Sequence, residues 1–215
     1  MRYKTVIFDL DGTLTDSGEG IIQCGICAAK EMGVEIPPRE KLLLMRGPAL
    51  KWSFTTLFGM SEEQTYQAIQ IYRKYYTTVG LEYNGTFDGV LEMLEKLTAA
   101  GMRVYVATAK YQKHGRLVCR KVGIRKRIHG VFGSGDPKKH EGKDAIIARI
   151  LKKPWVSSNA VMIGDKDMDI IAGKKCGIDT IGVTYGYAAE GELEGQQPTH
   201  LIGSVEELTR FLLGE

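Results

Sequence analysis

The chain has 215 residues, 43% of them hydrophobic and 26% charged, with a formal net charge of +3 at pH 7. This length suits an α/β domain with or without a smaller insertion, and so small a charge gives no support for a nucleic-acid partner. No run of about 18 apolar residues occurs and the first residues lack the apolar region of a secretory signal, so we expect a cytoplasmic protein that does not enter a membrane.

Short apolar runs bounded by turn residues recur along the chain and predict strands. They cover residues 5–8, 104–107, 128–132, 160–163 and 180–183. Continuous apolar character is typical of strands that are buried on both faces, and segments with helical spacing lie between these runs. The alternation predicts an α/β fold with a Rossmann-like parallel sheet.

The interval 17–84 follows the first strand and contains helical patterns only. We expect helices over approximately residues 21–32, 38–45, 49–58 and 61–79. The last begins with a capping box at 61–64, and its apolar face carries Ala68, Tyr72, Tyr75 and Val79. We interpret the tyrosines as core residues rather than ligand contacts. The sequence thus predicts an all-helical insertion at 17–84 and a core made of 1–16 and 85–215.

Cys24 and Cys27 form a CxxC pair inside the first of these helices. No second CxxC or nearby histidine completes a zinc site, and the pair does not follow a strand as thioredoxin-like chemistry would require. We therefore interpret both cysteines as small apolar residues on one helix face.

Two helices of the second half have clear ends in the sequence. One has apolar residues at 90, 91, 94 and 97, a Glu92–Lys96 pair, and Gly101 to close it. The other begins with a capping box at 204–207 and continues with apolar residues on one face, so it is expected to cover the sheet.

Five basic residues gather near one predicted helix end: Arg120, Lys121, Arg125, Lys126 and Arg127. We interpret them as a solvated helix end and turn. A weak role in attracting anionic substrates stays open. Binding of nucleic acid is the weakest functional alternative, and changing Arg125 and Arg127 would then weaken a salt-sensitive association.

The first predicted strand ends in Asp9-Leu10-Asp11-Gly12-Thr13, which places two carboxylates where an open α/β sheet keeps its ligands. Because side chains of an extended chain alternate, Asp9 and Asp11 share one face. One can attack phosphorus while the other exchanges a proton with the leaving oxygen and with water. Gly12 lets the backbone turn and approach an anion. An ordinary Asp-Gly turn is the alternative.

Four later residues at the ends of predicted strands and helices carry side chains that can bind phosphate or a metal ion. Thr108 ends a strand and offers a hydroxyl to a phosphoryl oxygen. Lys143 precedes a helical run and offers a cation to the charge shared by nucleophile and phosphate. Asp165 ends another strand and Asp169 lies one helical turn later, an arrangement that suits magnesium. The calcium-loop and Walker A patterns that these segments partly imitate each lack a required glycine.

Taken in this order, Asp9 with Asp11, Thr108, Lys143, and Asp165 with Asp169 resemble the four motifs of the haloacid dehalogenase superfamily. The resemblance spans nearly the whole chain. A helical insertion after the first motif, and the Gly-Val-Thr-Tyr-Gly-Tyr segment at 182–187, resemble the phosphoglycolate-phosphatase-like branch. The resemblance implies a haloacid-dehalogenase-like core with a small all-helical cap domain.

The resemblance also implies the roles of the acidic residues. Asp9 is the nucleophile, and Asp11 is the general acid and base. Mg²⁺ is the implied cofactor, held by Asp9, by the carbonyl of Asp11 and by Asp165. Asp169 supports the water shell of the metal.

Substrate binding is implied for two groups of residues. In the core, the phosphate-binding residues are Gly12, Thr108, Ala109 and Lys143, with Lys138 and Lys139 as less favoured alternatives to Lys143. In the cap, Arg46 and Lys51 are candidates to meet a second polar or anionic group of the substrate, as an arginine fork would favour.

The implied activity is hydrolysis of a small phosphorylated metabolite through an aspartyl-phosphate, as in phosphoglycolate phosphatases, by a monomer or homodimer. 5'-Nucleotidase, pyrophosphatase and sugar-phosphate phosphatase activities stay open, and so does a binding protein that keeps the fold without turnover. Asp11 argues against dehalogenation. Ile21, where related mutases carry a histidine, argues against sugar-phosphate isomerisation.

Overall fold

A computed structural model describes residues 2–135 and 141–215. The chain forms two compact units. The sheet unit consists of Met1–Thr15 and Thr86–Glu215, and the helical unit consists of Asp16–Gly85. The chain leaves the sheet unit through β2 (Thr15–Asp16) and returns through β3 (Gly85–Thr86), which pair as a two-stranded sheet.

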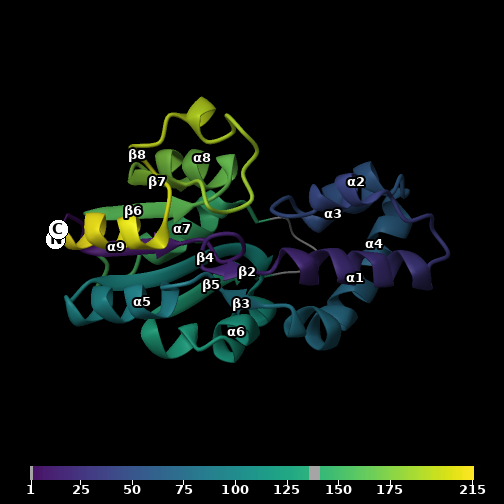
Figure 1. The fold of residues 1–215 in the computed structure, drawn as a ribbon, viewed down its shortest axis with the longest axis horizontal. Helices are drawn as coiled ribbons and strands as arrows, with labels where there is room; N and C mark the ends of the chain where they lie inside the picture. The colour runs from purple at the N-terminus through teal and green to yellow at the C-terminus, as the bar shows by residue number, and fades with distance from the viewer. Residues whose placement is uncertain (1, 136–140) are drawn as a thin grey trace. The chain divides into compact units, whose positions relative to one another are not determined.

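The sheet unit is built on six parallel strands in the order β5-β4-β1-β6-β7-β8 (Figure 1). They are β1 (Thr5–Phe8), β4 (Arg103–Tyr111), β5 (Gly130–Ser134), β6 (Ala160–Gly164), β7 (Asp179–Val183) and β8 (His200–Ile202). The predicted α/β class and parallel sheet are confirmed. Strand β8 was not predicted, because it is a three-residue edge strand whose Leu201 is 40% exposed, so it lacks a continuous apolar run.

Helices cover both faces of this sheet. The sheet unit contains α5 (Val90–Ala99), α6 (Gln112–Lys121), η3 (Ile124–Arg127), α7 (Lys143–Leu151), α8 (Asp167–Lys175), η4 (Glu194–Gln196) and α9 (Val205–Leu213). Helix α7 packs against α8 on one side, and α5 packs against α9 on the other (Figure 1). The α5 prediction is confirmed, since Glu92 and Lys96 pair at 2.8 Å and Gly101 follows with φ +84°.

The predicted capping box of the last helix is half wrong. Ser204 Oγ accepts a hydrogen bond from the Glu207 N–H at 3.1 Å, as predicted. The Glu207 carboxylate, however, accepts from the Gly203 N–H at 2.9 Å rather than from that of Ser204. The glutamate therefore ties the helix to the residue before its cap.

The core of the sheet unit fixes the strands beside one another. Ile7, Tyr105 and Met162, from β1, β4 and β6, pack with three isoleucines of α7, at 146, 147 and 150. Burying one such side chain contributes roughly 1.5–3 kcal/mol. Because Phe8 is in register with Val106 on one side and Ile163 on the other, the residues that follow these three positions lie at the same edge of the sheet.

The helical unit contains α1 (Gly18–Glu31), α2 (Arg39–Leu43), α3 (Leu50–Trp52) and α4 (Glu62–Tyr75), with π-helical turns η1 (Ser53–Leu57) and η2 (Tyr76–Gly80). The capping box at the start of α4 is confirmed, because Ser61 and Gln64 each bond the other's backbone N–H, at 3.2 and 2.9 Å. Helix α1 packs against α4. The cysteines of α1 form no disulfide, and Cys24 is buried.

The core of the helical unit corrects one prediction. Tyr72 is buried as expected, but Tyr75 is only half-buried and Tyr76 is fully buried instead. The α-helix gives way to a π-helical turn at Tyr76, which changes the face that the following residues present. The Tyr72 ring lies 5.8 Å from that of Tyr76 and 6.3 Å from that of Phe54.

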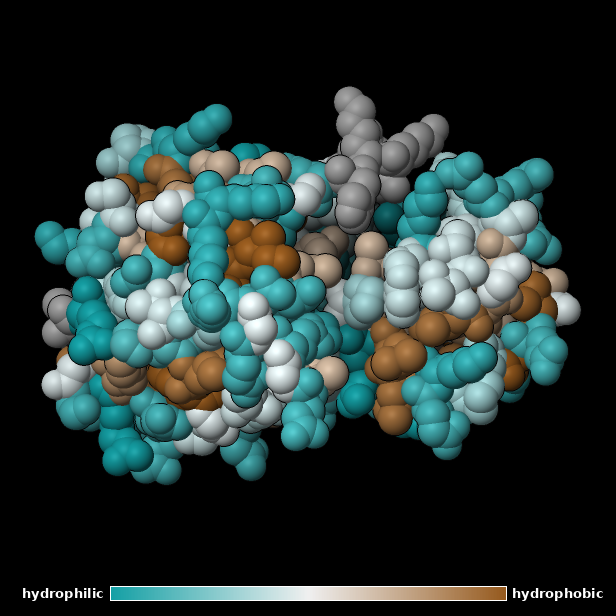
Figure 2. Space-filling view, turned by 90° about the horizontal axis from the view of Figure 1, so that it is seen from above, coloured by the Kyte–Doolittle hydropathy of each residue, from teal (hydrophilic) through white to brown (hydrophobic). Residues whose placement is uncertain are grey.

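The surface is mainly hydrophilic on the face in Figure 2, with separate hydrophobic patches on both units. Across residues 2–135 and 141–215, no helix combines the length and apolar character needed to cross a bilayer.

Candidate active site

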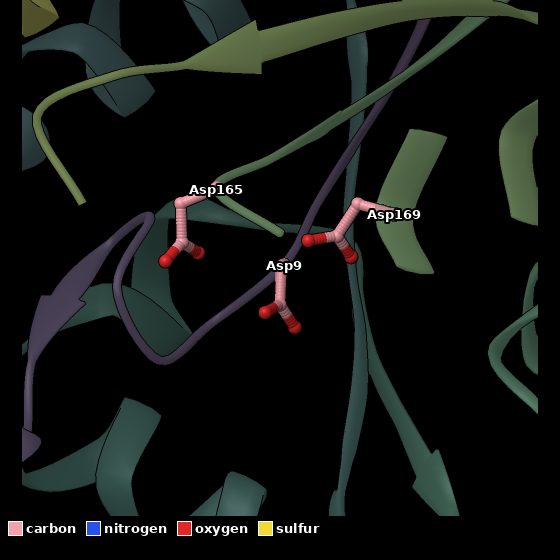
Figure 3. Close-up of side chains that lie close together, drawn as sticks. All are labelled: Asp9, Asp165 and Asp169. Atoms are coloured by element: carbon pink, nitrogen blue, oxygen red, sulfur yellow. The ribbon is translucent and has the colours of Figure 1, made fainter. Parts of the chain in front are cut away.

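Three buried carboxylates converge at the edge of the sheet where β1 and β6 end. Asp9 follows β1, Asp165 follows β6, and Asp169 lies in the first turn of α8 (Figure 3). One carboxylate oxygen from each lies within 4.8 Å of the others. The sequence placed these residues at a strand end or one helical turn later, and the structure brings them together.

Lys143 joins this cluster from the first position of α7 and is itself buried. Its ammonium lies 3.0 Å from Asp9 Oδ1 and also donates to Asp169 Oδ1. Burial alone would lower the pKa of Lys143, but the carboxylates of Asp169 and Asp9 outweigh it and the pKa is raised. The lysine therefore stays charged between two acids.

Asp165 is held from two sides. Its Oδ1 accepts a hydrogen bond from the Thr13 hydroxyl at 2.8 Å, and its Oδ2 accepts from the Tyr187 N–H at 2.9 Å. Gly12, with φ +85°, passes so close that an added Cβ would lie 2.2 Å from Asp165 Oδ2. Only glycine combines this backbone conformation with this approach.

Burial dominates the protonation of the carboxylates. It raises the pKa of Asp9 to about 7, opposed by Lys143 and reinforced by Asp169 and Asp11. It raises the pKa of Asp165 to about 6, an effect that the Asp9 charge increases and the hydrogen bonds from Tyr187 and Thr13 reduce. The pKa of Asp169 is also raised by burial, against the opposing effect of Lys143.

This charge distribution fits a divalent cation. When all three carboxylates are ionised, they face one ammonium, which leaves two negative charges without a neutralising partner among these four residues. Buried charges are stable only when they are paired or coordinate a metal. Hard oxygen donors from one or two carboxylates, completed by water and substrate, suit Mg²⁺. Asp169 is occupied by Lys143 and by the Lys166 N–H at 3.0 Å, so Asp9 and Asp165 are the better placed ligands.

The remaining predicted residues of the sheet unit follow β1 or lie in the last part of β4. Asp11 pairs with Lys110 at 2.9 Å, and both side chains are largely buried. Thr108 is buried near the end of β4, and its hydroxyl accepts from the Lys110 N–H at 3.2 Å. Ala109 and Lys110 stand outside the β4–β5 pairing, which moves directly from Thr108 to Tyr111. Lys110 thus pairs with Asp11 from a bulge of β4, a feature that re-aims side chains.

The other predicted binding residues belong to the helical unit or fall outside the described residues. Arg46, in the helical unit, donates from Nε to the Leu43 carbonyl at 3.1 Å. Lys51 pairs with Glu62 at 2.6 Å on the exposed surface of that unit. Lys138 and Lys139 lie outside the described residues.

Several supporting residues were missed by sequence reasoning. The loop after β7 lies against the site, where the Tyr185 hydroxyl donates to the Thr13 carbonyl at 3.0 Å. Glu192 ties this loop to the start of α8, because it pairs with Lys166 at 2.6 Å and accepts from the Asp167 N–H at 3.2 Å. The Tyr-Gly-Tyr residues at 185–187 indicate the loop in the sequence, whereas no local pattern around Glu192 predicts its role.

Comparisons with known proteins agree on one family. The sequence model of the haloacid dehalogenase-like hydrolases matches residues 6–183. A 5'-nucleotidase of Pseudomonas aeruginosa is 33% identical over 99% of this chain and 96% of its own length. A phosphoglycolate phosphatase of Vibrio parahaemolyticus is 28% identical over 95% of this chain and 94% of its own.

A tyrosine-protein kinase, PtkA of Mycobacterium tuberculosis, is 33% identical over 86% of this chain, but the match spans 63% of that protein. Among solved structures, that of a predicted phosphatase from Clostridium acetobutylicum is 31% identical and superposes over 100% of both chains with a TM-score of 0.91. Sequence and fold therefore agree over the residues that carry the site.

Proposed function

The chain belongs to the haloacid dehalogenase-like hydrolase family and is a phosphatase, and from this premise we propose that it hydrolyses small phosphate monoesters with magnesium and an aspartyl-phosphate intermediate. The observation that carries the proposal is the buried cluster of Asp9, Asp165 and Asp169 around Lys143. A cation bound there would supply Lewis-acid neutralisation of the phosphoryl oxygens.

The residues of the chain divide the reaction between them. Asp9 attacks phosphorus and forms an acyl-phosphate bond, while the bond from phosphorus to the leaving oxygen breaks and Asp11 gives that oxygen a proton. Water then attacks the same phosphorus, Asp11 takes its proton, and inorganic phosphate leaves a free Asp9. Lys143 orients the nucleophile at 3.0 Å and offsets the repulsion between two anions.

Substrate positioning is assigned to the rim of the cluster. The Gly12 backbone, on the loop after β1, and Thr108 and the backbone of Ala109, in the last part of β4, would hold the phosphoryl oxygens. We further propose that residues 17–84 act as a cap, where Arg46 or Lys51 selects the leaving group. Alanine at both positions should change the ranking of substrates, whereas Lys41→Ala, an exposed cation of the same unit, should not.

A panel of phosphate monoesters tests the activity. We expect phosphate release that a magnesium chelator abolishes and that Asp9→Asn lowers by at least about 10³-fold, because the nucleophile is lost. Asp88→Asn makes the same chemical change at an exposed position of the sheet unit and should be neutral. Equal release by Asp9→Asn and wild type would exclude the covalent route.

A narrower candidate is 5'-nucleotidase activity on nucleoside monophosphates. Its support is the Pseudomonas aeruginosa relative, which carries that name and matches nearly end to end. A kcat/KM at least about tenfold higher for nucleoside 5'-monophosphates than for phosphoglycolate would favour this candidate, and the reverse ranking would favour phosphoglycolate.

A further inference from the structure

A pocket lies at the β5 edge of the sheet and shares no lining residue with the candidate active site. Its volume is about 270 Å³. Its walls include Tyr105 of β4, Arg116 of α6, Arg125 of η3, Phe132 of β5, and Lys153 and Trp155 from the turn after α7. All of these belong to the sheet unit.

Three cations line this pocket, and no acidic residue is among its lining residues. Arg116 and Lys153 form no salt bridge within the described part of the chain, and Arg125 donates to the Ile128 carbonyl at 3.4 Å. Arg127, two residues further along, is instead paired with Glu95 at 2.6 Å. The basic cluster of the sequence therefore divides: Arg127 is paired with an acid, whereas Arg125 lines the pocket and forms no salt bridge with any described residue.

An unsatisfied donor lies in the same wall. Tyr105 is only 2% exposed, and within residues 2–135 and 141–215 its hydroxyl has no hydrogen-bond partner. Buried polar groups are hydrogen-bonded as a rule, so this hydroxyl would gain from an acceptor that the described residues do not supply. An anionic oxygen is the acceptor that the surrounding cations favour.

Aromatic surface accompanies these cations. The Trp155 side chain is exposed, at 58%, although burial of a large indole is the common outcome. Phe132 packs edge-on against Tyr105, with ring centroids 6.1 Å apart. An exposed indole beside guanidinium groups is suited to stack on the π-face of a ring whose phosphate meets the cations.

We infer that this pocket binds a small phosphorylated ligand that carries a planar aromatic ring, the chemical class of nucleoside monophosphates. Arg116, Arg125 and Lys153 hold the phosphate, the Tyr105 hydroxyl donates to it, and the ring stacks on Trp155. The volume suits a monophosphate whose remaining part stays in solvent. The inference concerns a site apart from Asp9 and does not depend on the reaction proposed there.

Tryptophan fluorescence can report on this pocket. The chain has two tryptophans, so Trp52→Phe leaves Trp155 as the single reporter. In that variant, with Asp9→Asn added to limit hydrolysis of the probe, adenosine 5'-monophosphate should change the emission with a saturable dependence. Adenosine and inorganic phosphate should each bind at least about tenfold more weakly, because each lacks one half of the recognised group.

Substitutions locate the binding. Arg116→Gln with Arg125→Gln should weaken binding of adenosine 5'-monophosphate by at least about tenfold. Tyr105→Phe, which removes one hydroxyl, should also weaken this binding measurably. Lys126→Gln, an exposed cation of η3 that does not line the pocket, is the matched control. With Asp9 and both tryptophans intact, the arginine double variant should hydrolyse p-nitrophenyl phosphate at the wild-type rate.

Several results would overturn the inference. One is an affinity for adenosine 5'-monophosphate that is unchanged in both the double variant and Tyr105→Phe. Another is that adenosine alone, or inorganic phosphate alone, binds as tightly as adenosine 5'-monophosphate. The last is a fluorescence response to oligonucleotides only. Should the double variant fail to fold by circular dichroism, the Tyr105→Phe titration decides alone.

Discussion

Glu192 should control how tightly the site holds its cation, although it contacts none of the three clustered carboxylates. Its carboxylate accepts from the Ala189 N–H at 2.9 Å and the Asp167 N–H at 3.2 Å, and pairs with Lys166 at 2.6 Å. These contacts join the loop after β7 to the start of α8. The same loop supplies the Tyr187 N–H that donates to Asp165.

The size of the effect follows from how Asp165 is held. Glu192→Ala frees the loop and with it the Tyr187 hydrogen bond, but the hydrogen bond from Thr13 at 2.8 Å does not depend on the loop. Loss of a residue that supports metal ligands typically weakens metal binding by about 10–100-fold. Because half of the support of Asp165 survives, we expect the lower end, about tenfold.

The assay is phosphate release as a function of magnesium concentration. Glu192→Ala should raise the half-saturating magnesium concentration by about tenfold and leave kcat at saturating magnesium close to wild type. Glu190→Ala, in the same loop but exposed, is the control. Equal half-saturating magnesium concentrations for Glu192→Ala and Glu190→Ala would contradict this prediction.

The same residue gives stability a defined pH dependence. Burial acts to raise the pKa of Glu192, but the hydrogen bonds from Lys166, Ala189 and Asp167 outweigh it and hold the pKa below its ordinary value of 4.5. The folded protein thus binds this proton more weakly than the unfolded chain. The stabilisation is complete above about pH 4.5 and is lost as the pH falls through the folded pKa. In urea unfolding, the difference between wild type and Glu192→Ala should therefore be present at about pH 6 and shrink at about pH 3.

Three further changes test packing around the site and in the helical unit. Gly12→Ala should lower the free energy of unfolding by about 1–2 kcal/mol and reduce phosphate release, because alanine is strained at φ +85° and its Cβ meets Asp165. Tyr185→Phe removes the donor to the Thr13 carbonyl and should lower the free energy of unfolding in urea by about 0.5–1.5 kcal/mol. An unchanged free energy of unfolding would contradict this prediction. Phe54→Ala should destabilise the helical unit by about 3–5 kcal/mol, since Phe54 is fully buried, whereas Trp52→Ala, 42% exposed, should stay within about 0.5 kcal/mol.

The sequence predicted the elements whose residues carry an unambiguous local pattern. The apolar run at 5–8 and the capping box at 61–64 each depend on neighbours within a few positions, and both are found in the structure. Edge strand β8 was missed because only one of its three residues, Ile202, is buried. The π-helical turn at Tyr76 was missed because helical periodicity assumes a constant number of residues per turn.

For the site, the motif positions Asp9, Lys143 and Asp165 were predicted from residue type and placement at element boundaries. The partners that orient them were not. Lys110 pairs with Asp11 from an irregular part of β4 after Thr108, and Glu192 accepts a hydrogen bond from a residue 25 positions away. Such contacts are set by tertiary packing, which leaves no periodic trace in one sequence.

The register between β1 and β6 links the fold to the chemistry. Both strands are buried along their whole length, so their apolar pattern alone does not distinguish one register from the next. A slip by one residue would move Asp9 by about 3.3 Å along the strand and turn it to the opposite face. Hydrogen bonds at both ends define the observed register: the Lys4 and Thr5 N–H groups donate to the Asn159 carbonyl at 3.1 Å, and the Asp9 N–H donates to the Ile163 carbonyl at 2.8 Å. The backbone group that ends the strand pairing thus belongs to the residue proposed as nucleophile, so correct pairing of the sheet and assembly of the acidic cluster are one structural event.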